Sequence, residues 1–253
     1  MDNDPQTALD YLPNQMRRYL RQVLTGLQEV LQDRLLCVAL TGGSSIPGCA
    51  EGSPSPVVAV LVSDLAIEDL YLLAKQTSDA LKHDIQVHVL TAHEFDRSRD
   101  VFALEVADWR DRHTMLYGED LLANTVVTPT HLRASLERAW RGFRMRLRVQ
   151  LLDALSRGLA GPNAQRAIER TFERLVTLAH HTVCLNGGVP DGDEARLLEQ
   201  LARIVDMDAE PLTTALLEFR QKGRYATPTE LFDRIDHLAT RAADHVDRFD
   251  VAR

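Results

Sequence analysis

The sequence has few cysteines and no long apolar run. Its 253 residues include three cysteines, an odd number without metal-ligand spacing, which argues against a disulfide framework and a cysteine-based metal site. Cys37 and Cys184 lie in apolar segments, which is typical of small buried side chains. No apolar run approaches the roughly 20 residues that a membrane span needs, and the acidic residues 1–5 are not typical of a secretory signal. We therefore expect a cytoplasmic protein with no membrane partner.

Basic residues are also in the minority. Lys and Arg total 29 against 37 Asp and Glu, so the formal net charge is -8. This balance excludes a general nucleic-acid binder and leaves room only for a local basic stripe. Hydrophobic residues make up 45% and charged residues 26% of the chain, which excludes wholesale disorder. The length allows one large or two modest domains.

The first part of the chain alternates helical and strand-like segments. Apolar residues at three- and four-residue spacing predict a helix over residues 7–34. Two apolar runs, residues 35–40 and 57–62, predict buried strands on either side of a glycine- and proline-rich loop, residues 41–56. This order predicts a mixed α/β domain.

The next segments continue the same alternation. We expect Ser63 and Asp64 to cap a helix over residues 65–82. Further short strands are predicted over residues 85–90, 101–106 and 114–117. The mixed α/β domain is therefore predicted to cover residues 1–130.

The rest of the chain, residues 131–253, is predicted to be a helical bundle. Its apolar stripes recur at helical spacing and are interrupted by residues 158–162 and 186–188, which are rich in glycine. Thr227, Pro228 and Glu230 form a start signal for the last helix. The fold class predicted for the whole chain is α+β.

The loop after the first strand has the composition of an anion-binding site. A glycine- and serine-rich loop that follows a buried strand can direct several backbone N–H groups at one phosphate. Phosphoryl chemistry would also need carboxylates to hold a metal ion, and residues 57–62 contain none. The alternative is a connecting turn whose glycines supply a positive φ. The predicted nucleotide-binding residues are Gly42, Gly43, Ser44 and Gly48.

Residues 43–48, Gly-Ser-Ser-Ile-Pro-Gly, resemble the Gly-Ser-x-x-x-Gly loop of the nucleotidyltransferase superfamily. Residues 100–108, followed by His113, residues 116–118 and Asp120, are similar to a stretch of bacterial nucleotidyltransferase-like proteins with a C-terminal helical domain. The resemblance implies a nucleotidyltransferase-like α/β domain followed by a helical bundle. It also implies a Ser-Asp-x-Asp motif on the second strand, whose acids hold two metal ions.

The sequence departs from this motif at the metal ligands. If Ser55 aligns with the family's serine, Pro56 and Val58 occupy the carboxylate positions. The later strand that usually supplies a third acid offers Gln86 and His88 instead. The comparison therefore implies a degenerate nucleotidyltransferase, a pseudoenzyme that binds a nucleotide without magnesium or acts as a regulatory or interaction module. We expect no required cofactor and no metal site.

Two enzymatic alternatives stay open. One is an active metal-dependent nucleotidyltransferase with relocated carboxylates, for which Asp64 and Glu105 are the candidates. The other follows from Arg174 and His180, whose spacing resembles the R-x(4–6)-H motif of HEPN helical ribonucleases. That resemblance implies metal-free RNA cleavage across a dimer interface.

The first helix of the bundle has a basic face formed by Arg141, Arg144 and Arg148. Such a face can bind phosphate or RNA, or it can form ion pairs with acidic residues. In an acidic protein we favour ion pairs with acids of the other domain, or a solvated face, and do not expect RNA as a partner. The apolar stripes of the bundle could instead extend into a protein partner or a homo-oligomer interface.

Overall fold

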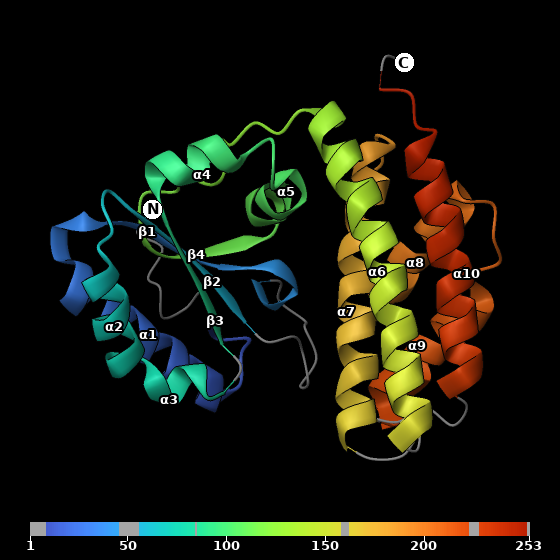
Figure 1. Cartoon of the computed structure of the whole chain (residues 1–253), viewed down its shortest axis with the longest axis horizontal. Helices are drawn as coiled ribbons and strands as arrows, with labels where there is room; N and C mark the ends of the chain where they lie inside the picture. The colour runs from blue at the N-terminus through green and yellow to red at the C-terminus, as the bar shows by residue number, and fades with distance from the viewer. Residues whose placement is uncertain (1–8, 46–55, 84, 158–161, 223–227, 252–253) are drawn as a thin grey trace. The chain divides into compact units, whose positions relative to one another are not determined.

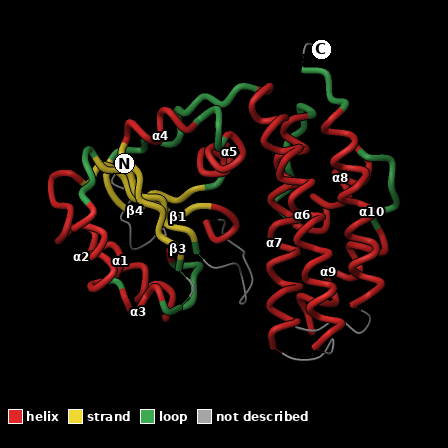
Figure 2. The backbone as a smooth tube through the Cα atoms, in the orientation of Figure 1, coloured by secondary structure: helices red, strands yellow, loops and turns green. Residues whose placement is uncertain are grey.

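The computed structural model describes residues 9–45, 56–83, 85–157, 162–222 and 228–251. The chain divides into two compact units, Met1–Val127 and Thr128–Arg253. The first contains a four-stranded sheet with helices on both faces, and the second consists of packed helices (Figure 1, Figure 2). The predicted α+β organisation is confirmed. No helix within the described ranges is both long and apolar enough to cross a membrane.

The first unit is built around the sheet β3-β2-β1-β4. β1 pairs antiparallel with both β2 and β4, whereas β2 and β3 are parallel. The elements follow in the order α1 (Asn14–Leu31), η2 (Gln32–Arg34), β1 (Leu35–Thr41), η3 (Gly42–Ser45), β2 (Val57–Val62), α2 (Ile67–Gln76), α3 (Ser78–Leu81), β3 (Gln86–Thr91), α4 (Ala92–Ser98), α5 (Ala103–Asp111) and β4 (His113–Gly118).

The two central strands are buried on both faces. Helices α1, α2 and α3 cover one face and α4 and α5 the other (Figure 1). Val38 and Val58 belong to the core under the first set of helices. Ala39 and Ala59 belong to the core under the second set, where they meet Trp109. Burial on both sides explains why β1 and β2 are continuous apolar runs instead of alternating ones.

The predicted helix over residues 65–82 is two helices. α2 and α3 are separated at Thr77, which is buried and donates its hydroxyl to the Leu73 carbonyl oxygen at 2.7 Å. The predicted cap by Ser63 and Asp64 is wrong, because α2 begins after Ala66. Asp69 closes this end instead, since its carboxylate accepts a hydrogen bond from the Ala66 N–H at 2.9 Å.

Residues 103–106 form the start of helix α5, so the predicted strand over residues 101–106 is wrong. Ala103, Leu104, Val106 and Ala107 are all buried, and their i, i+1, i+3, i+4 spacing covers one helical face. The apolar run looked like a strand because it is short, and short apolar runs fit either period.

Helix α4 was not predicted, although its start has a recognisable signal. The Thr91 hydroxyl accepts a hydrogen bond from the Glu94 N–H at 3.1 Å, and the Glu94 carboxylate accepts one from the Thr91 N–H at 2.8 Å. This reciprocal capping box is readable as Thr-x-x-Glu in the sequence.

The first helix also differs from its prediction, since α1 begins only after Pro13.

The second unit confirms the predicted helical half. Its core contains Trp140, which is fully buried and donates its indole N–H to the Thr182 hydroxyl at 3.1 Å. The predicted breaks at residues 158–161 and the predicted cap at Thr227 lie outside the described residues. The helices are α6 (Pro129–Arg157), α7 (Pro162–Leu185), α8 (Glu194–Ile204), α9 (Glu210–Lys222) and α10 (Pro228–Asp247).

Gly118 makes the closest backbone approach in the sheet. Its φ is +79°, and a Cβ at this position would lie 2.0 Å from the Leu36 carbonyl oxygen. We therefore expect Gly118→Ala to lower the free energy of unfolding of the first unit by roughly 2 kcal/mol or more, from left-handed backbone strain and steric displacement together. Urea unfolding followed by Trp109 fluorescence in a Trp140→Phe background measures this, because the chain has two tryptophans.

The matched control is Gly187→Ala in the second unit. Gly187 has a φ of +74°, but no atom lies within 4 Å of the added Cβ. Only the backbone strain of roughly 1 kcal/mol is then expected, measured by Trp140 fluorescence in a Trp109→Phe background. Equal losses in the two variants would contradict the steric part of the argument.

The ion pair between Arg34 and Asp69 should make the first unit sensitive to acid. Arg34 donates two hydrogen bonds to the carboxylate, at 2.6 and 2.8 Å, and this guanidinium lowers the pKa of Asp69 from 3.8 to about 2. Because the folded-state pKa is depressed, the stabilisation is complete above about pH 4 and is lost as the pH falls towards 2. Asp69→Asn should therefore be less stable than the parent at pH 7 and match it near pH 2.

Glu68→Gln is the control for this experiment, because Glu68 is an exposed carboxylate in the same first turn of α2. Its difference from the parent should be smaller at pH 7. If the Asp69→Asn difference persisted undiminished at pH 2, the ion pair would not be its source.

Candidate functional site

The loop after β1 is tied to the neighbouring elements at its first turn. Gly42 has a φ of +73°, and its N–H donates to the Arg112 carbonyl oxygen at 2.9 Å. The Ser45 hydroxyl donates to the Gly42 carbonyl oxygen at 2.7 Å, and the Thr114 hydroxyl donates to the Ser45 carbonyl oxygen at 3.0 Å. The end of α5 and strand β4 therefore hold η3 in place.

A nearly buried ion pair lies beside this turn. Arg112 donates its Nε–H to Asp108 Oδ1 at 2.7 Å and binds the same oxygen through Nη2. Their side chains are 4% and 15% exposed. A Cβ on Gly42 would lie 3.6 Å from Asp108 Oδ2, an ordinary contact. Asp108 is therefore a carboxylate next to the loop, and its charge is balanced by Arg112.

The predicted nucleotide-binding residues have different positions in the structure. Gly43 and Ser44 lie within η3. The N–H of Gly42 is used inside the domain, in the bond to Arg112, so it does not point to a ligand as the sequence had suggested. Gly48 lies outside the described residues. The amides of Gly43 and Ser44 therefore stay the predicted phosphate donors of this turn.

The two positions that the resemblance aligns with metal ligands, Pro56 and Val58, are apolar in the structure. Val58 is fully buried in the core under α1, and its strand neighbours are Leu40 and Val87. Pro56 is also buried. On β3, Gln86 and His88 are exposed. The residues of β1, β2 and β3 include no aspartate or glutamate.

The structure does not place the predicted replacement carboxylates, Asp64 and Glu105, beside the loop that follows β1. Because β1 and β2 are antiparallel, the loop lies beside Val57, whereas Asp64 follows the other end of β2. That end is held by a 2.9 Å hydrogen bond from the Ser63 N–H to the Arg34 carbonyl oxygen. Glu105 is exposed in the first turn of α5. Asp108 lies one turn later in α5. Its carboxylate is close to Gly42, since a Cβ there would lie 3.6 Å from Asp108 Oδ2.

Hydrogen bonds of Asp120 hold the turn after β4. His113 Nε2 lies 3.1 Å from Asp120 Oδ2, and Asp120 Oδ1 accepts hydrogen bonds from the N–H groups of Leu122 and Ala123 at 3.1 and 3.0 Å. Burial alone would raise the pKa of Asp120, but these hydrogen bonds outweigh burial and lower it. With Gly118 packed on the β1 backbone, this stretch shapes the edge of the sheet.

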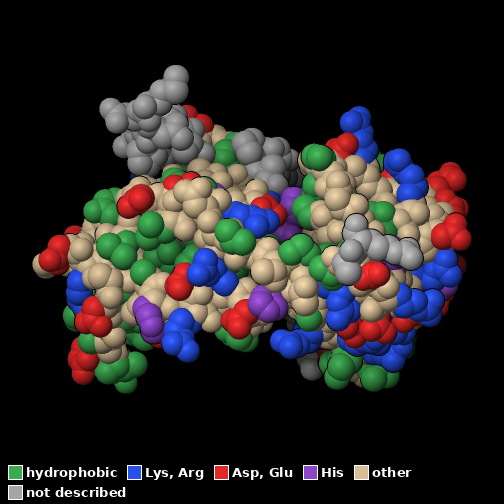
Figure 3. Space-filling model, turned by 90° about the horizontal axis from the view of Figure 1, so that it is seen from above, with side chains coloured by type: hydrophobic (Ala, Val, Ile, Leu, Met, Phe, Trp, Pro, Cys, Tyr) green, Lys and Arg blue, Asp and Glu red, His purple; other side chains and the backbone are tan. Residues whose placement is uncertain are grey.

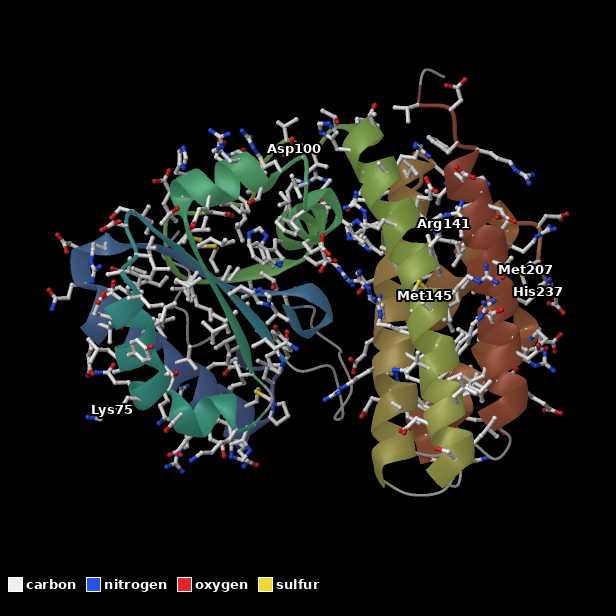
Figure 4. All side chains as sticks on the ribbon, in the orientation of Figure 1. Lys75, Asp100, Arg141, Met145, Met207 and His237 are labelled. Atoms are coloured by element: carbon white, nitrogen blue, oxygen red, sulfur yellow. The ribbon has the colours of Figure 1, made fainter. Side chains whose placement is uncertain are left out.

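The basic face of α6 is occupied by ion pairs with α10 of the same unit. Arg141 binds Glu137 at 2.9 Å and Asp247 at 3.2 Å, and its side chain lies between α6 and α10 (Figure 4). Arg144 and Arg148 both bind Asp236, at 3.2 and 3.4 Å. Basic and acidic side chains lie next to one another over this unit in Figure 3. The expected ion pairs therefore form, but with acids of the helical unit itself.

The residues of the ribonuclease-like motif do not share a helical face. Arg174 and His180 both lie on α7, and six residues place them about 120° apart around the axis. His180 instead contacts His181, with ring centroids 4.8 Å apart at 70°.

A cavity of about 590 Å³ lies in the helical unit, where α7, α8 and α10 end. Its lining mixes Arg241 and Arg248 with Asp206 and Asp244. His245 lies in it at 2.9 Å from Asn186 Oδ1, and burial lowers the pKa of this imidazole. The mixed charge favours no single ligand class, and the residues come from three separate segments, so no sequence pattern predicts this cavity.

The chain matches no protein-family model, and no curated protein matches it. Among solved structures, spectinomycin adenyltransferase from Enterococcus faecialis, solved with ATP and spectinomycin, matches 92% of this chain and 99% of its own, with a TM-score of 0.59 and 8% identity. The chain has a nucleotidyltransferase fold. A nucleotidyltransferase-like protein from Exiguobacterium sibiricum is 15% identical over 89% of this chain and 73% of its own, with a TM-score of 0.30.

Asp236 should contribute measurably to the stability of the helical unit. Burial raises the pKa of Asp236, but hydrogen bonds from Arg144 and Arg148 outweigh burial and lower it. Asp236→Asn removes the charge shared by both arginines and should lower the free energy of unfolding by about 1 kcal/mol. Arg148→Ala should cost less, because that side chain is 61% exposed and Arg144 still binds Asp236. Urea unfolding followed by Trp140 fluorescence in a Trp109→Phe background ranks the two, and a reversed order would contradict this account.

Proposed function

We propose that this chain binds a nucleotide at the loop after β1 and does not carry out metal-dependent nucleotidyl transfer. It would then act as a nucleotide-sensing or interaction protein. The observation that carries the proposal is the composition of β2: Val57–Val62 is entirely apolar, and Val58 is fully buried. Two-metal catalysis requires carboxylates that hold the ions against the phosphates, and this strand has no side chain for that role.

In this proposal the loop supplies the donors for a phosphate. Backbone N–H groups of Gly43 and Ser44 and the Ser44 hydroxyl would bind the phosphate oxygens, because oriented amides form anion-binding concavities. The positive φ of Gly42 starts the turn. Arg112 balances the charge of Asp108, so the phosphates would not meet an uncompensated carboxylate at this position.

ATP is the first nucleotide to test. The spectinomycin adenyltransferase that shares the fold was solved with ATP, which supports ATP as the probe for this chain. Nothing in the apolar strand argues for spectinomycin as a substrate, and the proposal does not include one.

Active transfer with relocated carboxylates is the second candidate. Asp108 favours it, since its carboxylate lies close to Gly42. A metal ion would have to compete with Arg112 for that carboxylate. This candidate requires magnesium for nucleotide binding, and it would transfer AMP from ATP to an acceptor oxygen with pyrophosphate as the leaving group.

Thermal unfolding with ATP tests the proposal. With EDTA present, ATP at a hundred times its dissociation constant should add about 2.7 kcal/mol to the stability of the native state. For a chain of this length the midpoint should rise by roughly 2–4 °C for each kcal/mol. Ser44→Ala should weaken ATP binding about tenfold, because one hydrogen bond to a charged oxygen is lost.

Ser63→Ala is the matched control, since Ser63 is an exposed serine at the opposite end of β2. It should leave the ATP-dependent shift unchanged. A shift that needs magnesium and disappears in Asp108→Asn would support the active enzyme and contradict the proposal. A shift equal in the parent and Ser44→Ala would place ATP elsewhere.

A further inference from the structure

Helix α7 brings three metal-binding side chains together near its C-terminal end. One ligand atom from each of His180, His181 and Cys184 lies within 4.8 Å of the others. This set is separate from the loop after β1, and it lies wholly within the helical unit. The sequence offers no cysteine pair with metal-ligand spacing, and this set combines a single cysteine with two histidines.

The helical period explains the convergence. Cys184 follows His180 by four residues and His181 by three, and both spacings place side chains on the same face, one turn apart. The two imidazole rings are close neighbours, with centroids 4.8 Å apart. All three donors therefore come from one rigid turn of helix and need no loop to order them.

The surroundings are those of a semi-enclosed site. His181 is fully buried, whereas His180 and Cys184 are partly buried. Cys184 is a thiol in this structure and not part of a disulfide. Partial burial keeps bulk water away from part of the site.

We propose that His180, His181 and Cys184 bind a divalent cation of the Zn²⁺ class. Two imidazole nitrogens and one thiolate are a ligand set that Zn²⁺ prefers over the oxygen-seeking Mg²⁺ or Ca²⁺. Around a tetrahedral Zn²⁺ the ligand atoms lie roughly 3.5 Å apart, so small side-chain rotations close the present spacing. Three protein ligands leave the fourth position for water or an incoming ligand.

Co²⁺ provides the direct test, because a thiolate bound to Co²⁺ gives a charge-transfer absorption band that imidazole alone does not. The full chain, purified with a chelator and then freed of it, should develop this band with one equivalent of Co²⁺, and Zn²⁺ should abolish it. Cys184→Ser should lose the charge-transfer band, and His180→Ala should weaken Co²⁺ binding at least tenfold.

His237→Ala and Cys37→Ala are the matched controls. His237 is an exposed histidine on α10 (Figure 4), and Cys37 is a buried thiol in the first unit. Both variants should bind Co²⁺ like the parent. Fluorescence of Trp140 and the far-ultraviolet circular dichroism of each variant show whether the helical unit is folded.

Three outcomes would overturn the proposal. They are absence of the charge-transfer band in a folded parent, its persistence in folded Cys184→Ser, or equal loss of Co²⁺ affinity in His180→Ala and His237→Ala. If Cys184→Ser does not fold, the His180→Ala titration decides the matter. None of these outcomes depends on ATP, so this site and the proposed nucleotide loop succeed or fail independently.

Discussion

Burial of β2 on both faces is the constraint on which the rest of the first unit depends. The strand lies between β1 and β3, with α1 on one side and α4 on the other. A carboxylate introduced at Val58 would be desolvated in this core, which favours its neutral form and opposes ion binding. The apolar strand therefore stabilises the sheet that supports the loop, and the same side chains exclude a two-metal centre on that strand.

Long periodic patterns were predicted correctly from the sequence, whereas one short apolar run, residues 101–106, was assigned to the wrong element. The helices of the second unit have apolar stripes several turns long, so their period is unambiguous. The segment that begins α5 has only a few apolar residues before Asp108, and both periods fit them. The break between α2 and α3 at Thr77 could not be predicted. It depends on a buried hydrogen bond from Thr77 to Leu73, which no local propensity describes.

The candidate site shows the same division. The sequence identified the glycine-rich loop and the missing acids of β2, since both are local properties. It could not show that Arg112 uses the N–H of Gly42, because that contact crosses 70 residues of chain. The arginines of α6 are similar: Asp236 lies 92 residues beyond Arg144. Their basic face is visible in sequence, whereas the carboxylates that balance its charge are found only in the folded bundle.

The His180, His181 and Cys184 cluster was readable in principle, because three and four residues are the spacings of one helical face. The sequence alone does not mark it as a metal site, because His180 also fits a ribonuclease-like motif and Cys184 fits a small buried apolar side chain. Partial burial adds information that spacing lacks. It distinguishes a set that can gather around an ion from three side chains that happen to be close in sequence.

The most direct test of the account is an amide NMR titration of the ¹⁵N-labelled chain with ATP in EDTA. The account predicts saturable shifts of the Gly43 and Ser44 amide resonances without magnesium, and no ATP turnover after magnesium is added. If these resonances moved only in the presence of magnesium and pyrophosphate then accumulated, the chain would be an active nucleotidyltransferase and the central claim would be wrong.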